Sequence, residues 1–251
     1  MPYRTLDLAE AAAYLHLSRI EVEQLMKTTD IPHERRGGRV VFLRGKIDAW
    51  ASQRILGLPP KALTVYHQKS THATRAVFEQ DALIPDLLPS GFVEPALTAK
   101  TKGSVIRDMV AFAGKTGRVL DPRELLDSLE AREELCSTAL PGGLAMLHCR
   151  NHEAYRFEGS FLMLGRTVQG IHFGAPDGRP TRLFFLICCQ DERIHLHALA
   201  RLCLIVLKTD VLDRLLAAPD AGTMRDALLT AEQTVLTGKK PADTHLPSGS
   251  A

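Results

Sequence analysis

The most informative segment of the chain is Gly143-Leu144-Ala145-Met146-Leu147-His148. It is a short apolar run that ends in a histidine, and residues 161–164 and 183–189 form apolar runs of similar length. Short apolar runs of this kind are typical of strands that are buried on both faces of a sheet. We therefore predict a strand at each of the three segments.

Helices are predicted before and after these strands. Residues 101–113 and 122–131 carry apolar side chains at helical spacing, and Asp121 is placed to cap the second of these helices. Residues 196–207 and 223–235 have the pattern of amphipathic helices. Strands interleaved with helices indicate an α/β domain, in which helices are layered on a sheet.

Polar and charged residues lie before and after the apolar run that ends at His148. Arg132-Glu133 and Ser137-Thr138 precede it, and His195-Leu196 follows it. This order resembles the enzyme IIA domains of the bacterial sugar phosphotransferase system, of the mannitol, fructose and nitrogen-regulatory type. The resemblance spans residues 81–232 and implies an α/β fold with a mixed β-sheet layered with helices.

The resemblance also implies a phosphoryl-carrying site. His148 would accept a phosphoryl group from a phosphocarrier protein of the phosphotransferase system, with Arg132 and His195 beside it as catalytic partners. Ser137 and Thr138 would bind the phosphate. A neutral imidazole is a nucleophile near pH 7, and the arginine fork pairs two phosphate oxygens. We therefore expect Arg132, His148 and His195 to converge on a phosphate-sized space that is open to a partner.

The chain departs from the family pattern beside the proposed nucleophile. Leu147 stands where proline is usual, and Cys149 stands where a small residue such as glycine is common. Proline would fix the backbone there, and glycine would leave room for the approaching partner. The alternative is therefore a degenerate domain that binds a ligand or a protein without chemistry. A third hypothesis is a transport carrier that passes phosphate to a sugar permease, which the N-terminal segment disfavours.

Other histidines and cysteines raise the question of a metal site. His152 and His197 lie close in sequence to the two site histidines, but no pair has the tight spacing of a structural zinc site. Cys188 and Cys189 would point to opposite faces of a strand. We therefore predict no metal and no cofactor, and we expect His197 at the surface or at the start of a helix.

The first 55 residues predict a second, smaller unit. Asp7-x-x-Glu10 and Ser18-x-x-Glu21 are capping-box patterns, and each opens a helix. Gly37-Gly38 predicts the turn of a β-hairpin, and a short helix at 45–54 carries Trp50. Two capped helices so close together predict a helix-turn-helix.

This pattern, over residues 5–54, resembles the small winged-helix modules of excisionases and MerR-type regulators. The resemblance implies that the helix at 19–28 enters the major groove of DNA and that the wing at 34–42 lies along the backbone or in the minor groove. Residues 35–46 carry five basic side chains and no acidic one, which suits contacts with phosphates. The expected DNA-binding residues are Arg19, Gln24, Lys27, Arg35, Arg36 and Arg39. The alternative is a winged helix that contacts a protein.

Composition sets the outer limits. The chain has 251 residues, a formal net charge of +2 and five cysteines without C-x-x-C spacing. We expect a cytoplasmic protein with reduced thiols and no membrane segment. We also expect a homodimer, because one small module makes few DNA contacts. The predicted segments are a winged helix-turn-helix domain at 1–55, a linker at 56–80 with one helical turn at 73–78, an enzyme IIA-like domain at 81–236 and a disordered tail at 237–251.

These expectations predict a cytoplasmic DNA-binding regulator of transcription. Its enzyme IIA-like domain would act as a phosphohistidine carrier, and phosphorylation of His148 would report the carbon, nitrogen or energy state of the cell. A phosphoryl group adds nearly two negative charges, which is enough to change the docking of a neighbouring module.

Overall fold

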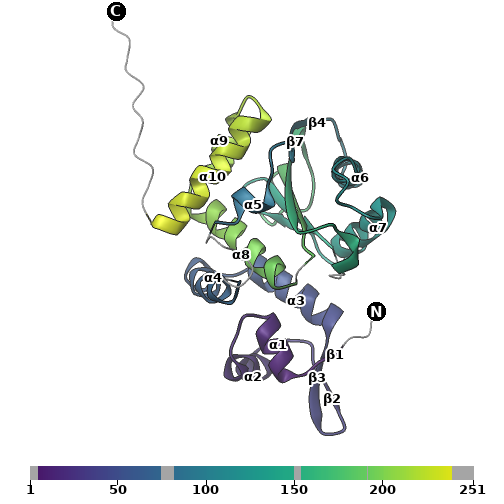
Figure 1. Ribbon diagram of the computed structural model, residues 1–251, viewed down its shortest axis with the longest axis vertical. Coiled ribbons are helices and arrows are strands. Elements are labelled where there is room, and N and C mark those ends of the chain that lie inside the picture. Colours follow the sequence, from purple (N-terminus) through teal and green to yellow (C-terminus); the bar gives the residue numbers. More distant parts are fainter. Residues whose placement is uncertain (1–4, 75–81, 150–153, 191, 239–251) are drawn as a thin grey trace, which may run out of the picture.

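The computed structural model describes residues 5–74, 82–149, 154–190 and 192–238 (Figure 1). Within these residues a small N-terminal module lies below an α/β domain (Figure 1). No helix among the described residues is long and apolar enough to cross a membrane.

The N-terminal module comprises β1 to α3. Both capping boxes form. The side chains of Asp7 and Ser18 each accept from the backbone amide three residues on, and the glutamate at that position accepts from the amide of the capping residue. The hairpin turns at Gly37 and Gly38, whose φ angles of 56° and 78° suit glycine. The predictions of two capped helices and a wing are therefore confirmed. The elements are β1 (Thr5–Leu6), α1 (Leu8–Tyr14), α2 (Arg19–Thr28), β2 (Glu34–Arg36), β3 (Arg39–Leu43) and α3 (Arg44–Leu56).

The α/β domain is built on a five-stranded mixed sheet with the strand order β4-β7-β8-β6-β5. Strand β8 pairs in parallel with β6 and antiparallel with β7. The strands are β4 (Val93–Leu97), β5 (Ala139–Leu140), β6 (Leu144–His148), β7 (Phe161–Ile171) and β8 (Thr181–Cys188). The helices are α5 (Ile84–Leu87), α6 (Lys102–Gly114), α7 (Pro122–Glu133), the 3-10 turn η1 (Ala154–Arg156), α8 (Glu192–Lys208), α9 (Val211–Ala217) and α10 (Ala221–Thr237).

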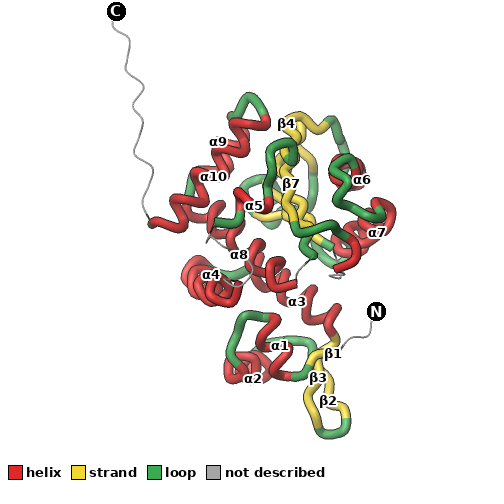
Figure 2. The backbone as a smooth tube through the Cα atoms, in the orientation of Figure 1, coloured by secondary structure: helices red, strands yellow, loops and turns green. Residues whose placement is uncertain are grey.

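Helices cover both faces of this sheet (Figure 2). Ala145 and Leu147 of β6 face the cluster that includes α6 and α7. Leu144 and Met146 face the opposite cluster, which includes α8 and α10. Because side chains alternate along a strand, His148 follows Leu144 and Met146 onto the α8 side. The predicted mixed α/β architecture is confirmed.

The segment expected to be a linker instead contains a helix, α4 (Pro60–Thr74). This helix packs along α8, and α3 packs on α8 beside it. Its buried residues are Leu63, His67, Ser70 and Thr74, which share one face. Because three of these four side chains are polar, hydrophobic spacing did not reveal the helix. The expected helical turn at 73–78 falls mostly outside the described residues.

The module, α4 and the α/β domain share one apolar core. Leu6, Phe42 and Ile55 of the module belong to the same buried cluster as Leu63 of α4 and Leu199 of α8. The N-terminal module is therefore docked on the α/β domain through α3 and α4. The chain is described to Gly238, just after α10, so almost all of the expected disordered tail lies outside the described residues.

Candidate functional site

Three side chains from three elements meet at one end of the sheet. Arg132 lies in the last turn of α7, His148 at the end of β6 and His195 in the first turn of α8. The Nε of Arg132 donates to Nε2 of His148 at 3.0 Å. The rings of His148 and His195 have their centroids 5.2 Å apart and are tilted by 48°. The structure thus brings these three residues together.

The hydrogen bonds of His148 define its tautomer. Its Nδ1 lies 2.9 Å from the carbonyl oxygen of Met146, which can only accept, so Nδ1 carries the proton. Its Nε2 then holds the lone pair, toward which Arg132 donates. A neutral imidazole in this tautomer presents Nε2 as the nucleophilic atom.

The site is closed in this structure. Arg132 and His148 are each 2 % exposed, and His195 is 0 % exposed. Ser52 of α3 places its Oγ 3.1 Å from Nε2 of His195, so the N-terminal module lies against the site. The expectation of a space open to a partner was wrong for this conformation, because the docking of α3 on α8 had no signal in the sequence.

A buried carboxylate supports the turn between α7 and β5. Glu133 is 5 % exposed, pairs with Lys102 at 2.9 Å and accepts from both the amide and the hydroxyl of Thr138. Ser137 donates its hydroxyl to the carbonyl of Phe173 at 2.8 Å. Both hydroxyls are thus engaged in local structure, and their phosphate contacts stay predictions.

Sequence reasoning gave no role to three residues near the site. Cys136 accepts from Nη1 of Arg132 through its carbonyl oxygen at 3.1 Å and its sulfur at 3.5 Å. Glu133 holds Thr138, and Ser52 contacts His195. Glu133 directly follows Arg132 in the sequence, so its place near the site could have been predicted. Ser52 could not be found, because it lies 143 residues away from its partner.

A second group with an arginine and two histidines lies further along α8. Arg201 donates from Nε to Nε2 of His67 on α4 at 2.6 Å. The rings of His67 and His197 stack with their centroids 5.2 Å apart. The Oγ of Ser70 lies 2.7 Å from Nδ1 of His197. His197 is 1 % exposed, so the expectation of a surface position was wrong. The reason is that α4 covers this face of α8.

A carboxylate completes this second group. Arg201 pairs with Glu232 of α10 at 2.6 Å, and Glu232 also accepts from the amides of Leu83 and Ile84. Burial, followed by the charge of Arg201, lowers the pKa of His67 to about 3. Burial, followed by the neighbouring His67, lowers the pKa of His197 to about 2. Both imidazoles are therefore neutral near pH 7.

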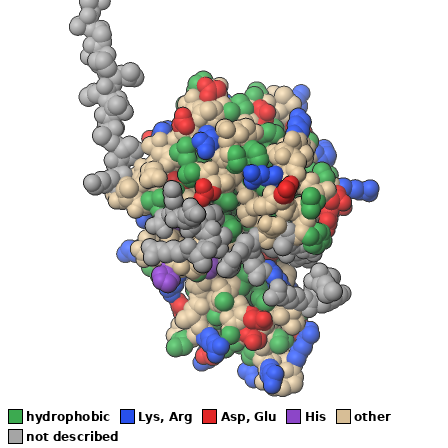
Figure 3. All heavy atoms as spheres, viewed as in Figure 1, with side chains coloured by type: hydrophobic (Ala, Val, Ile, Leu, Met, Phe, Trp, Pro, Cys, Tyr) green, Lys and Arg blue, Asp and Glu red, His purple; other side chains and the backbone are tan. Residues whose placement is uncertain are grey.

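The expected DNA-binding residues lie on the surface of the module. The side chains of Arg19, Gln24, Lys27, Arg35, Arg36 and Arg39 are all exposed. Figure 3 shows basic side chains around the lower tip of the molecule, where Figure 1 places β2 and β3. Glu34 pairs with Arg36 at 2.8 Å and with Lys46 at 3.6 Å. The hydrogen bond from Arg36 is the main cause of the lowered pKa of Glu34. The cluster at 35–46 is thus partly neutralised by an acidic neighbour just before it.

Comparison with known proteins settles the family. The model of the family "Phosphoenolpyruvate-dependent sugar phosphotransferase system, EIIA 2" matches residues 86–230, which is more than half of the chain. The chain belongs to this family. Residues 5–55 also match a helix-turn-helix domain model. The α/β domain is therefore an EIIA domain, and the N-terminal module is a helix-turn-helix domain.

The proteins to which the chain is similar include two curated relatives and one solved structure. The fructose-specific EIIABC component of Bacillus subtilis is 26% identical over 147 residues, which is 58% of this chain and 23% of that protein. A nitrogen regulatory protein of Pseudomonas aeruginosa is 32% identical over 124 residues, which is 47% of this chain and 79% of that protein. The nitrogen regulatory protein IIA-Ntr of Neisseria meningitidis shares the fold, with a TM-score of 0.53 and 24% identity over 59% of this chain and 99% of that one.

Proposed function

We propose that this protein is a DNA-binding regulator whose EIIA domain accepts a phosphoryl group on Nε2 of His148. The donor would be a phosphocarrier protein of the phosphotransferase system. The observation that carries the proposal is the contact of Arg132 with His148, together with the ring of His195, whose centroid lies 5.2 Å from that of His148. Family membership and the helix-turn-helix match support the two halves of the proposal.

The transfer follows from the tautomer of His148. The lone pair of Nε2 attacks phosphorus, the bond from phosphorus to the donor nitrogen breaks, and the donor imidazole leaves with that electron pair. The proton stays bonded to Nδ1, which donates to the carbonyl oxygen of Met146 throughout. The guanidinium of Arg132 moves from the lone pair to the phosphoryl oxygens, where its fork stabilises their charge.

The docked module explains how phosphorylation can act as a signal. With Ser52 against His195, and with His148 2 % exposed, a protein donor would reach Nε2 only after the site opens. We infer that α3 leaves α8 when it does. A phosphoryl group then adds about two negative charges to this buried contact, which opposes redocking of the module. The helix-turn-helix would be held against the EIIA domain before phosphorylation and released after it.

The proposed DNA contacts lie away from this docked surface. The exposed side chains of α2 and of the wing would bind phosphates and bases, and two modules in a homodimer would bind paired half-sites. The state of the site would set how freely each module can be oriented on DNA.

The test is incubation of the full chain with phosphorylated carrier protein, followed by intact-mass measurement. We expect one phosphoryl adduct that is lost in acid and is absent from His148→Ala. His172→Ala, which changes an exposed histidine, is the matched control and should be labelled like the wild type. An adduct that persists in His148→Ala would assign the acceptor role to another residue.

A second candidate is a regulator whose EIIA domain binds without chemistry. The burial of His148, with Leu147 and Cys149 beside it, favours this candidate. The wild type would then show no adduct at any carrier concentration, although its DNA binding would be retained.

A further inference from the structure

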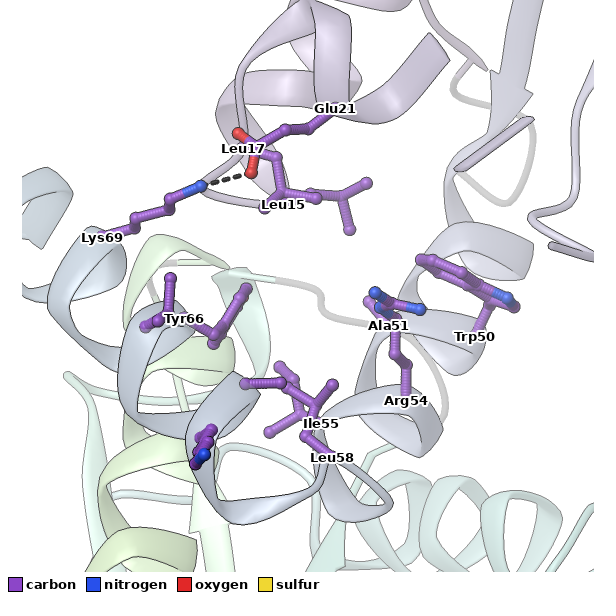
Figure 4. Close-up of a pocket in the computed structure, with 13 residues that line it drawn as sticks. Leu15, Leu17, Glu21, Trp50, Ala51, Arg54, Ile55, Leu58, Tyr66 and Lys69 are labelled. Atoms are coloured by element: carbon purple, nitrogen blue, oxygen red, sulfur yellow. Dashed lines mark hydrogen bonds and ion pairs between the residues drawn. The ribbon is translucent and has the colours of Figure 1, made fainter. Parts of the chain in front are cut away.

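A pocket of about 340 Å³ lies between the helix-turn-helix module and α4 (Figure 4). The turn between α1 and α2 and the helix α3 form one side of it, and α4 forms the other (Figure 4). Its volume falls at the lower end of the range of small-molecule sites. Most of its lining is apolar and includes Leu15, Ala51, Ile55 and Leu58. This site is separate from the one at His148.

The charged groups of the pocket are mostly cationic. Arg54, Lys61 and Lys69 line it together with one carboxylate, that of Glu21. Glu21 is taken up by an ion pair with Lys69, whose hydrogen bond is the main reason that the pKa of Glu21 falls to about 2. Among the described residues, no carboxylate pairs with Arg54 or Lys61. The pocket therefore retains two positive charges for an anion.

Tyr66 adds an unused hydrogen-bond donor. It lines the same pocket, and its hydroxyl is buried without a hydrogen-bond partner among the described residues. Burial raises the pKa of Tyr66, and the positive charge of Arg54 acts on it in the opposite direction. The guanidinium thus lies close enough to influence the hydroxyl. A buried hydroxyl without a partner costs free energy, which an anionic oxygen would recover.

We propose that this pocket binds a small amphipathic carboxylate. The apolar body would pack against Leu15 and Ile55, and the carboxylate would accept from Arg54 and from the hydroxyl of Tyr66. A cationic ligand would meet uncompensated positive charge, and a neutral one would leave Arg54 without an anion. The chemistry of the lining therefore selects one anionic group on an apolar body.

The position of the pocket gives the ligand a regulatory consequence, which rests on the proposed function. The module and α4 supply opposite walls, and α4 is packed along α8. A ligand that binds both walls stabilises the docked module by mass action and so keeps the site at His148 closed. The carboxylate would slow phosphorylation.

The binding test uses the full chain and three carboxylates, namely 4-phenylbutyrate, decanoate and indole-3-acetate. Isothermal titration should detect binding of at least one of them, while 4-phenylbutanol and 4-phenylbutylamine bind at least tenfold more weakly than 4-phenylbutyrate. Arg54→Gln should weaken carboxylate binding about tenfold, as the loss of a charge-assisted hydrogen bond implies, and Tyr66→Phe by a few-fold. Arg107→Gln, at an exposed position of α6 outside the pocket lining, is the matched control and should leave carboxylate binding unchanged.

A filling substitution gives a second, independent arm. Ala62→Trp places a large ring in the pocket from an exposed position of α4 and should abolish binding, whereas Gln68→Trp, which is exposed on the same helix outside the pocket lining, should not. Failure of all three carboxylates to bind overturns the proposal, as does equal binding of the amine. A dimer that Ala62→Trp disrupts, without carboxylate binding, would overturn it in favour of a second copy. No step uses a phosphocarrier, so the result is independent of the proposed function.

Discussion

The Oγ of Ser52 lies 3.1 Å from Nε2 of His195 and so joins the third helix of the helix-turn-helix module to the candidate site of the EIIA domain. The two residues are separated by 143 positions in the chain, and both are almost fully buried. This contact links the module to His148, because the ring of His195 lies next to that of His148 with the centroids 5.2 Å apart.

Enlarging Ser52 should open the site. In Ser52→Arg the longer side chain cannot fit between α3 and α8, so the module should undock and His148 should become accessible. We expect phosphorylated carrier protein to label this variant several-fold faster than the wild type, measured by intact mass against time. Gln53→Arg adds the same side chain at the exposed neighbouring position and should label at the wild-type rate. Slower or unchanged labelling of Ser52→Arg would show that the module does not shield the site.

Replacing Arg132 should slow phosphoryl transfer while leaving the acceptor in place. Arg132→Gln removes the guanidinium that donates to Nε2 of His148, and we expect the rate to fall by about 10²-fold, as with other charge-stabilising donors. Arg132→Lys keeps the charge but loses the planar fork, so its rate should lie between the two. Equal rates for Arg132→Gln and the wild type would show that Arg132 has no role in phosphoryl transfer.

The buried histidines predict a loss of stability in acid. The folded pKa values of His67 and His197, about 3 and 2, lie below the ordinary value of 6.5. Above pH 6.5 both groups are neutral in the folded and unfolded chains and have no effect. Below pH 6.5 the two histidines take up protons in the unfolded chain but stay neutral in the folded chain. The free energy of unfolding should therefore fall by up to about 1.4 kcal/mol per pH unit for each histidine, until the pH reaches the folded values.

Denaturant titrations between pH 7 and pH 4 measure this slope. His67→Gln, whose amide oxygen can still accept from Arg201, should make it shallower by about one proton. His72→Gln, at an exposed position of the same helix, should leave the slope unchanged. A slope in His67→Gln equal to that of the wild type would mean that His67 takes up its proton in the folded state.

The wing should show unequal contributions from its arginines. Arg35→Ala and Arg39→Ala should each weaken duplex binding and lower the salt slope by about one, because each loses one phosphate contact. Arg36→Ala should have a smaller effect, since Arg36 already pairs with Glu34. Binding titrations of the full chain across a range of salt concentrations give both quantities. Equal losses for all three variants would show that the pair with Glu34 opens on DNA.

The sequence predicted local structure well where the signal was itself local. The capping boxes at Asp7 and Ser18, the glycine turn of the wing and the apolar run ending at His148 all formed as expected. Helix α4 was missed because its buried face is mostly polar, and its partners Arg201 and His197 lie far along the chain. Their burial depends on a docking that neither segment encodes alone.

The candidate site was predicted only in part, for the same reason. The sequence order of Arg132, His148 and His195 predicted that they would meet, because their meeting depends on the fold of a single domain. The contact of Ser52 with His195 could not be predicted from the sequence, because it depends on how two domains pack. The expected open space and the observed burial differ for this reason.

The most direct measurement uses Trp50, which is the single tryptophan of the chain and lies on α3 in the pocket shared with α4. Its fluorescence should be followed during incubation with phosphorylated carrier protein that lacks tryptophan, with intact mass sampled in parallel. We expect the emission to change in step with formation of the adduct, and neither change to occur in His148→Ala. If an adduct forms on His148 while Trp50 emission stays constant, the module does not move on phosphorylation; if the wild type forms no adduct, His148 is not a phosphoryl acceptor.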